Sequence, residues 1–179
     1  MPLLVRSSLL ACLLLVACCC SSTETAFSTQ AAPYRLRFFH THTGERLDIV
    51  YRHGDKYDPD ALARISHYLR DHRTGDVHEY DPRVFDLLHD LTLGIGRPDA
   101  EIDVVCGYRT PWSNEYLRSH GHGVAVHSLH MQALAIDIRV PGVSTSKLRD
   151  IALALHRGGV GYYAASNFVH VDVGRVRRW

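Results

Sequence analysis

The side chains best suited to chemistry lie in two short stretches, Ser128–Asp137 and Phe168–Asp172. Together they supply two imidazoles, from His130 and His170, and the carboxylate of Asp137. Two histidines and one carboxylate are a ligand set that suits a catalytic zinc ion with one open coordination position. A histidine and an aspartate two residues apart on one strand usually form no more than a polar face, so the prediction rests on both stretches together.

Side-chain alternation predicts that each stretch contains a strand with one polar face. In the first, Asp137 alternates with apolar residues, and in the second, His170 and Asp172 alternate with valines. Successive side chains of a strand point to opposite faces, so the core would lie on one side and these polar groups on the other. If the two strands are neighbours, Asp137 and His170 lie about 5 Å apart across the ladder, and His130 completes the group from a loop.

Longer motifs around these residues resemble a known family of bacterial enzymes. The motifs are CGYRTP at 106–111, HSLHMQ at 127–132, GGVGYY at 158–163 and FVHVD at 168–172. In this order they resemble the murein endopeptidase K family, within the zinc D-Ala-D-Ala carboxypeptidase and dipeptidase superfamily of peptidoglycan peptidases. The resemblance covers about residues 34–179. It implies a Zn2+ ion held by His130, Asp137 and His170, with Arg109 facing the substrate.

Two positions depart from the superfamily pattern. Many members carry an acidic residue three positions before the last histidine ligand, where this chain has Asn167. Asp172 is the nearest replacement, either as the general base or as an acceptor that orients an imidazole. The second departure is Ala133, where members usually have glycine, so the turn must tolerate a Cβ that is unfavourable at positive φ.

Arg109 follows a predicted strand, at a place where loop residues can point into a cleft. A guanidinium there suits a substrate carboxylate, or the oxyanion that forms when an amide is attacked. On the residues alone, a surface or capping arginine is the better interpretation. The family resemblance reverses that preference.

The N-terminal residues indicate export from the cytoplasm. Residues 1–17 contain one positive charge and then an apolar run too short to span a membrane, which is typical of a secretory signal peptide. The segment ending at Cys18 resembles a bacterial lipobox, which implies a lipid anchor at Cys18, and a signal peptide cut later, near Ala26 or Ala32, is the alternative. Residues 18–33 are expected to form a flexible tether. The expected location is the periplasm, with the protein anchored to the membrane as a lipoprotein.

The remaining residues, 34–179, are enough for a single domain with one core. The formal net charge is +1 and basic residues do not cluster with aromatic ones, so nucleic acid is not an expected partner. We expect a monomer.

Cys106 is the one cysteine of this domain, which excludes an intradomain disulfide and predicts a buried thiol. We interpret His40 and His42 as surface residues. The histidines of the loop at 120–127, His127 among them, are interpreted as solvated, with an alternative ligand or a second metal in this loop as the other interpretation.

Local signals predict an α+β fold. Thr43-Gly44 fits the turn of an opening hairpin, and Asp58-Pro59 and Asp81-Pro82 fit helix starts. Gly94 fits the end of the second of these helices, and Ser144 or Thr145 fits the start of the last helix. We expect a small, largely antiparallel sheet that forms late in the chain, with flanking helices and the zinc site on the sheet face.

These observations predict a zinc-dependent peptidoglycan endopeptidase. Zinc lowers the pKa of a bound water toward about 7 and polarises the scissile carbonyl, while Arg109 would steady the developing charge and Asp172 is the leading candidate for the base. The implied substrate is the crosslinking peptide, cut either between two diaminopimelate residues or between D-Ala and diaminopimelate. Two alternatives remain: a non-catalytic zinc-containing peptidoglycan-binding lipoprotein, which Asn167 keeps open, and a structural zinc domain.

Overall fold

The computed structural model describes residues 33–121 and 123–179. The predicted signal peptide and Cys18 lie outside the described residues, and the first strand already begins at Pro33. In chain order the elements are β1 (Pro33–His40), β2 (Arg46–His53), β3 (Lys56–Tyr57), α1 (Pro59–Tyr68), α2 (Pro82–Ile95), β4 (Glu101–Cys106), α3 (Pro111–His120), η1 (Leu129–Gln132), β5 (Ala135–Arg139), α4 (Thr145–Leu155), β6 (Gly159–Tyr163), β7 (Phe168–Asp172) and β8 (Arg177–Arg178). Within these ranges, no helix has the length and apolar character that crossing a membrane requires.

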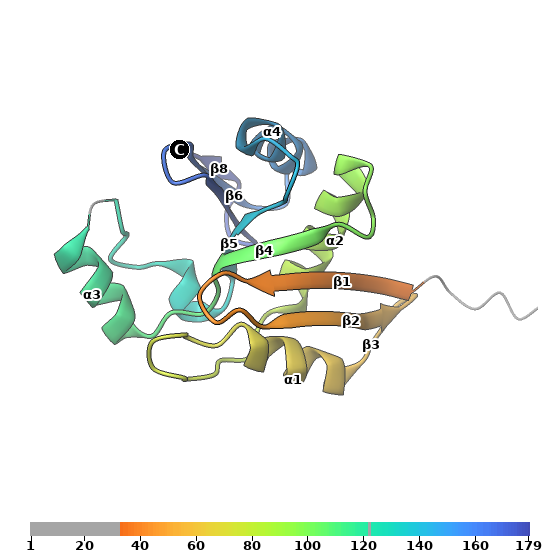
Figure 1. Ribbon diagram of the computed structural model, residues 1–179, viewed down its shortest axis with the longest axis horizontal. Helices are drawn as coiled ribbons and strands as arrows, with labels where there is room; N and C mark the ends of the chain where they lie inside the picture. The colour runs from red at the N-terminus through yellow and green to blue at the C-terminus, as the bar shows by residue number, and fades with distance from the viewer. Residues whose placement is uncertain (1–32, 122) are drawn as a thin grey trace, which may run out of the picture. The chain divides into compact units, whose positions relative to one another are not determined.

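The strands form one eight-stranded sheet in the order β3-β2-β1-β4-β5-β7-β6-β8 (Figure 1). β1 pairs with β4 and β6 with β8 in parallel, and the other neighbours are antiparallel. The expectation of a small, largely antiparallel sheet formed late in the chain is therefore wrong, because the sheet is mixed and includes the opening hairpin. The long connection through α1 and α2 returns the chain parallel to β1, and local periodicity does not reveal such a pairing.

The helices begin at the capping residues that the sequence predicts. Asp58 and Asp81 accept hydrogen bonds from first-turn amides of α1 and α2, each with proline next in the chain, and they satisfy amides that have no partner within the helix. The expected end of α2 at Gly94 is wrong, since Gly96 adopts the left-handed conformation that ends the helix. Gly94 instead permits close packing, because a Cβ there would lie 2.6 Å from a side chain of α4.

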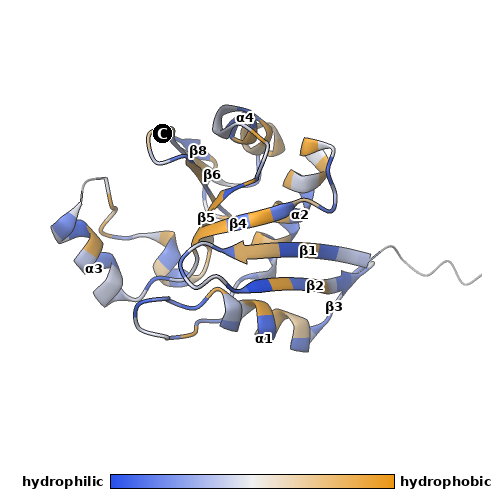
Figure 2. Cartoon of the chain, in the orientation of Figure 1, coloured by the Kyte–Doolittle hydropathy of each residue, from blue (hydrophilic) through white to orange (hydrophobic). Residues whose placement is uncertain are grey.

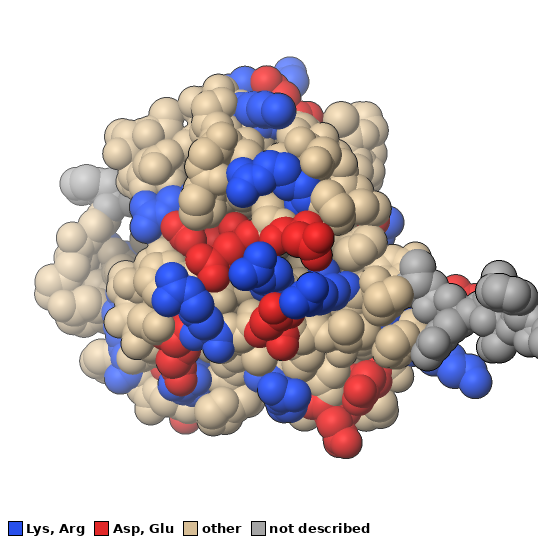
Figure 3. All heavy atoms as spheres, turned by 45° about the vertical axis from the view of Figure 1, so that its right-hand side comes forward, with Lys and Arg blue, Asp and Glu red and all other residues tan. Residues whose placement is uncertain are grey.

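The two faces of the sheet differ in character. Apolar strand residues on one face pack with α1, α2 and α4 into a single core, and the alternation of apolar and polar residues is visible along β4 in Figure 2. The other face carries ion pairs such as Arg46 with Glu101 and Arg139 with Asp103. Figure 3 shows basic and acidic side chains interspersed across one face of the molecule. Asp137 shares the polar face because it is two residues from Arg139 on β5.

Candidate metal centre

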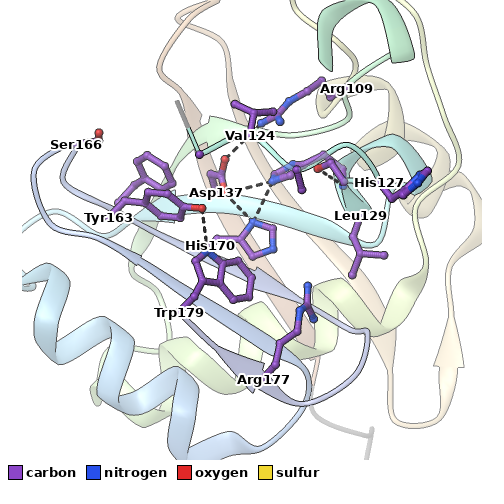
Figure 4. A pocket seen from close by; sticks show the side chains of 15 residues that line it. Arg109, Val124, His127, Leu129, Asp137, Tyr163, Ser166, His170, Arg177 and Trp179 are labelled. Carbon is purple, nitrogen blue, oxygen red and sulfur yellow. Dashed lines mark hydrogen bonds and ion pairs between the residues drawn. The ribbon is translucent and has the colours of Figure 1, made fainter. Parts of the chain in front are cut away.

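Three side chains meet on this polar face where β5 and β7 pair. Asp137 and His170 are directly opposite in the register, and Asp137 Oδ1 lies 2.9 Å from His170 Nδ1. His130 comes from η1, just before β5, and its Nε2 lies 3.2 Å from Asp137 Oδ1 and 3.1 Å from His170 Nδ1. The predicted pairing of the two strands is confirmed, and one atom from each side chain forms a compact triangle (Figure 4).

The triangle is slightly smaller than the spacing between the ligands of a tetrahedral zinc ion. With bonds of about 2.0 to 2.1 Å, two ligand atoms of a tetrahedral zinc lie about 3.3 Å apart. The three separations here are 2.9, 3.1 and 3.2 Å. Three protein ligands would leave the fourth position for water or substrate, which is the arrangement of a catalytic site.

Hydrogen bonds behind each imidazole determine which ring nitrogen faces the triangle as an acceptor. His130 Nδ1 lies 2.8 Å from the carbonyl oxygen of Gly107, which can only accept, so Nδ1 carries a hydrogen and Nε2 is the nitrogen that would offer its lone pair to a metal once its own proton has left. His170 Nε2 lies 3.1 Å from Asp172 Oδ2, which leaves Nδ1 with the free lone pair. Histidines that bind metals commonly donate their other ring hydrogen in this way.

Asp172 is fully buried, and donors surround its carboxylate. Oδ1 accepts from the amides of Gly159 and Gly174, both at 2.9 Å, and Arg177 donates to Oδ1 at 3.1 Å and to Oδ2 at 2.7 Å. Burial alone would raise the pKa of Asp172, but the hydrogen bonds from His170, Arg177 and the two amides outweigh burial and hold this pKa well below its usual range. The carboxylate is thus held ionised behind the His170 ring.

The centre of the triangle favours positive charge. Burial would lower the pKa of His130, but the nearby Asp137 and Cys106 outweigh burial and raise it. Burial would likewise raise the pKa of Asp137, but the two histidines hold it well below its usual range. The buried carboxylate stabilises a proton on the neighbouring histidine, and its negative charge would stabilise a metal cation in the same way. Binding of a metal would displace that proton.

Arg109 lies beside the triangle and not on the surface. Only 8% of the residue is exposed, and its Nη2 lies 3.7 Å from Asp137 Oδ2. Nη2 donates to the sulfur of Cys106 at 3.3 Å, and Nη1 donates to Asn114 Oδ1 at 3.2 Å. The surface interpretation of Arg109 is therefore wrong, while its contact with substrate stays a prediction.

Cys106 provides a second combination of ligand-type atoms. Its sulfur forms a group with His130 and Asp137 in which all ligand atoms lie within 4.8 Å of one another. The thiol is free and buried, as predicted, but it faces this polar site. The group that contains His170 is tighter, with no separation above 3.2 Å.

A cavity of about 320 Å³ lies against the triangle. Besides the three residues of the triangle, its walls include Arg109, His127, Tyr163, Arg177 and Trp179 (Figure 4). The last three are not among the predicted site residues. The GGVGYY motif contained Tyr163, whereas Arg177 and Trp179 reach the site through β8, which is two residues long and too short to predict. His127 is exposed, as expected, although it also lines the cavity.

Ala133, Asn167 and His40 lie outside the triangle, and each has a distinct local environment. Ala133 has a φ of 51°, so its backbone adopts the left-handed conformation. Glycine, which superfamily members usually have at this position, would favour that conformation. Asn167 also has positive φ, and its side chain accepts a hydrogen bond from Thr145 and does not line the cavity. The interpretation of His40 as a surface residue is wrong, because it is fully buried at the end of β1.

Known proteins share most of this chain. The model of the family described as peptidoglycan L,D-endopeptidase MepK matches residues 28–179. A probable peptidoglycan L,D-endopeptidase MepK of Haemophilus influenzae is 41% identical over 147 residues, which cover 82% of this chain and 79% of the relative. The peptidoglycan L,D-endopeptidase MepK of Escherichia coli K12 is 37% identical over 158 residues, which cover 86% and 85% of the two chains. The family predicted from the motifs is confirmed, and the chain belongs to the peptidoglycan L,D-endopeptidase MepK family.

Proposed function

We propose that His130, Asp137 and His170 hold one zinc ion, and that this centre hydrolyses the crosslinking peptides of peptidoglycan. Membership of the MepK family makes the chain a peptidase that acts on peptidoglycan. The identity of the metal and of its ligands is our proposal. The observation that carries it is the triangle of ligand-type atoms, 2.9 to 3.2 Å apart, at the wall of the cavity.

The side chains around the triangle have separate tasks in this proposal. When bound, zinc supplies the acidity that makes a water nucleophilic near neutral pH and polarises the peptide carbonyl. Arg109 provides a permanent positive charge where negative charge develops on the carbonyl oxygen. Its contacts with Asn114 and Cys106 hold the guanidinium in place before substrate arrives, so the protein reorganises little during the reaction.

Asp172 acts, in our proposal, by orienting His170. Its donors occupy both carboxylate oxygens, and the residue has no exposed surface. A general base must reach the proton that it removes, so this environment supports the orienting role better than the role of base, which stays a prediction. Among the described residues that line the cavity, the one side-chain carboxylate is that of Asp137, a proposed ligand.

The bond that we propose as substrate links two diaminopimelate residues. The relatives are named L,D-endopeptidases, and this bond joins an L centre to a D centre. The bond between D-Ala and diaminopimelate joins two D centres. A peptidoglycan substrate also implies action outside the cytoplasm, and we propose the periplasm, with the lipid anchor at Cys18 as a further proposal that the resemblance to a lipobox supports.

Asn167 gives no support to a non-catalytic binding protein. Its side chain accepts a hydrogen bond from Thr145 and does not line the cavity. An asparagine in place of an acid at this position therefore leaves the groups that line the cavity unchanged. We therefore do not favour the non-catalytic alternative.

The test is cleavage of purified dimeric muropeptides by the full-length protein, followed by mass spectrometry. Separate samples contain dimers joined through two diaminopimelate residues and dimers joined through D-Ala and diaminopimelate. We expect conversion of the first kind to monomers, loss of activity with a chelator, and recovery on addition of zinc. His170→Ala should lose both zinc and activity. Cleavage that persists in chelator with no bound metal would refute the proposal.

A further inference from the structure

The hydroxyl of Tyr163 lies in the wall of the proposed catalytic cavity and has an unusual partner. Trp179 Nε1 lies 2.9 Å from this oxygen, and both side chains line the cavity (Figure 4). An indole N–H can only donate, so the tyrosine oxygen is the acceptor. The hydroxyl hydrogen therefore remains available, and Trp179 is the one hydrogen-bond partner of this hydroxyl among the described residues.

Both rings contact neighbouring side chains, although half of the Trp179 residue is exposed. The Tyr163 ring stacks on Phe168, with centroids 4.5 Å apart and planes at 17°. The Trp179 ring lies 5.2 Å from the ring of His170, and the guanidinium of Arg177 lies 4.9 Å from its centroid. The indole sits so close to β6 that a Cβ on Gly161 would approach it to 2.7 Å, so this position of the GGVGYY motif must be glycine for the indole to fit.

We propose that Tyr163 is a substrate-binding residue, whose hydroxyl donates a hydrogen bond to a carbonyl or carboxylate oxygen of the crosslinking peptide. Trp179 is a positioning residue, since it fixes the direction of the Tyr163 hydroxyl. This inference rests on the proposed function, because the bound peptide is the partner that the hydroxyl would meet. The carbonyl and carboxylate oxygens of a peptide are hydrogen-bond acceptors, and they can therefore accept the hydrogen of this hydroxyl.

The test compares two neighbouring tyrosines. Tyr163→Phe removes the hydroxyl and keeps the ring that stacks on Phe168. Tyr162→Phe is the matched control, because Tyr162 points to the opposite side of β6, where Arg149 lies over its ring. With dimers joined through two diaminopimelate residues as substrate, we expect kcat/KM to fall about tenfold for Tyr163→Phe, mainly through a higher KM. Bound zinc and the melting temperature should match the wild type.

A double-mutant cycle tests the role of Trp179. Trp179→Phe keeps an aromatic ring and removes the N–H donor, so we expect a smaller fall in kcat/KM. If Trp179 acts through the Tyr163 hydroxyl, the double variant should lose no more than Tyr163→Phe alone, because the second change then has nothing left to affect. Additive losses would overturn the positioning role.

The outcomes separate this inference from the proposed function. Cleavage by the wild type with an unchanged kcat/KM in Tyr163→Phe would overturn the inference alone. An equal fall in Tyr162→Phe would also overturn it, because the effect would then not be specific to the cavity. A wild-type protein that binds zinc and cleaves neither kind of dimer would overturn the proposed function, and the inference with it.

Discussion

Replacing Asp172 with asparagine tests how the metal centre is held, because the change keeps the shape of the side chain and removes its charge. The carboxylate accepts from two amides at Oδ1, from His170 at Oδ2, and from Arg177 at both oxygens. Asparagine has one accepting oxygen and one donating NH2 group. Whichever way its amide is turned, the NH2 group faces either the His170 ring hydrogen or the two backbone amides.

The expected magnitude follows from the hydrogen bond that is lost. A hydrogen bond to a charged group contributes about 1.5 to 3 kcal/mol, and loss of the group behind a histidine ligand weakens metal binding by about 10- to 100-fold. We expect Asp172→Asn to bind zinc more weakly by this factor, and turnover to recover largely when zinc is saturating.

A competition titration against a chromophoric chelator measures the zinc affinity, and kcat is then measured as a function of free zinc. Asp103→Asn is the matched control, because Asp103 pairs with Arg139 on the same sheet face and contacts none of the proposed ligands. This control should bind zinc as the wild type does. Unchanged zinc affinity in Asp172→Asn, together with lost turnover at saturating zinc, would refute the orienting role and identify Asp172 as the general base.

Three shorter predictions concern stability and the ligand set. Burial lowers the pKa of His40 to about 4, below the value of about 6.5 in the unfolded chain. The free energy of unfolding is therefore unaffected by His40 above pH 6.5 and falls by ~3 kcal/mol toward pH 4, as the unfolded chain takes up the proton first. In chemical denaturation, His40→Gln should show a correspondingly weaker dependence of this free energy on pH, and a dependence identical to that of the wild type would contradict the prediction. At Ala133, a change to valine should lower the free energy of unfolding by about 2 kcal/mol or more, because a branched side chain is unfavourable at positive φ. Ala133→Gly should stay within about 1 kcal/mol of the wild type, because relief of the left-handed conformation offsets the loss of a buried methyl. Cys106→Ala should keep one zinc per chain by elemental analysis, and loss of zinc would move the site to the group that contains Cys106.

The polar face that carries Asp137 and His170 could be predicted because side-chain alternation is local information. Alternation placed Asp137 and His170 on one face of two strands, and the structure pairs them directly. The same reasoning was available for His40, which continues the inward parity of Leu36 and Phe38 on β1. The lack of a partner carboxylate motif argues against a metal ligand at His40, but it does not place the side chain on the surface.

What the sequence did not reveal depends on contacts between distant segments. The parallel pairing of β1 with β4 joins residues such as Phe38 and Ile102, and no local pattern records it. Trp179 reaches the cavity because β8 pairs with β6, and a strand of two residues has no periodicity to detect. The environment of Asp172 likewise depends on Gly159 and Arg177, which flank it only after folding.

The zinc triad is tested most directly by a crystal structure of the zinc-loaded protein, with anomalous diffraction measured on both sides of the zinc absorption edge. We predict one anomalous peak, bonded to His130 Nε2, Asp137 Oδ1 and His170 Nδ1 at about 2.0 to 2.2 Å, with a fourth position open to the cavity. A zinc ion bound through the sulfur of Cys106 without His170, or the absence of a peak between these three residues, would contradict the account.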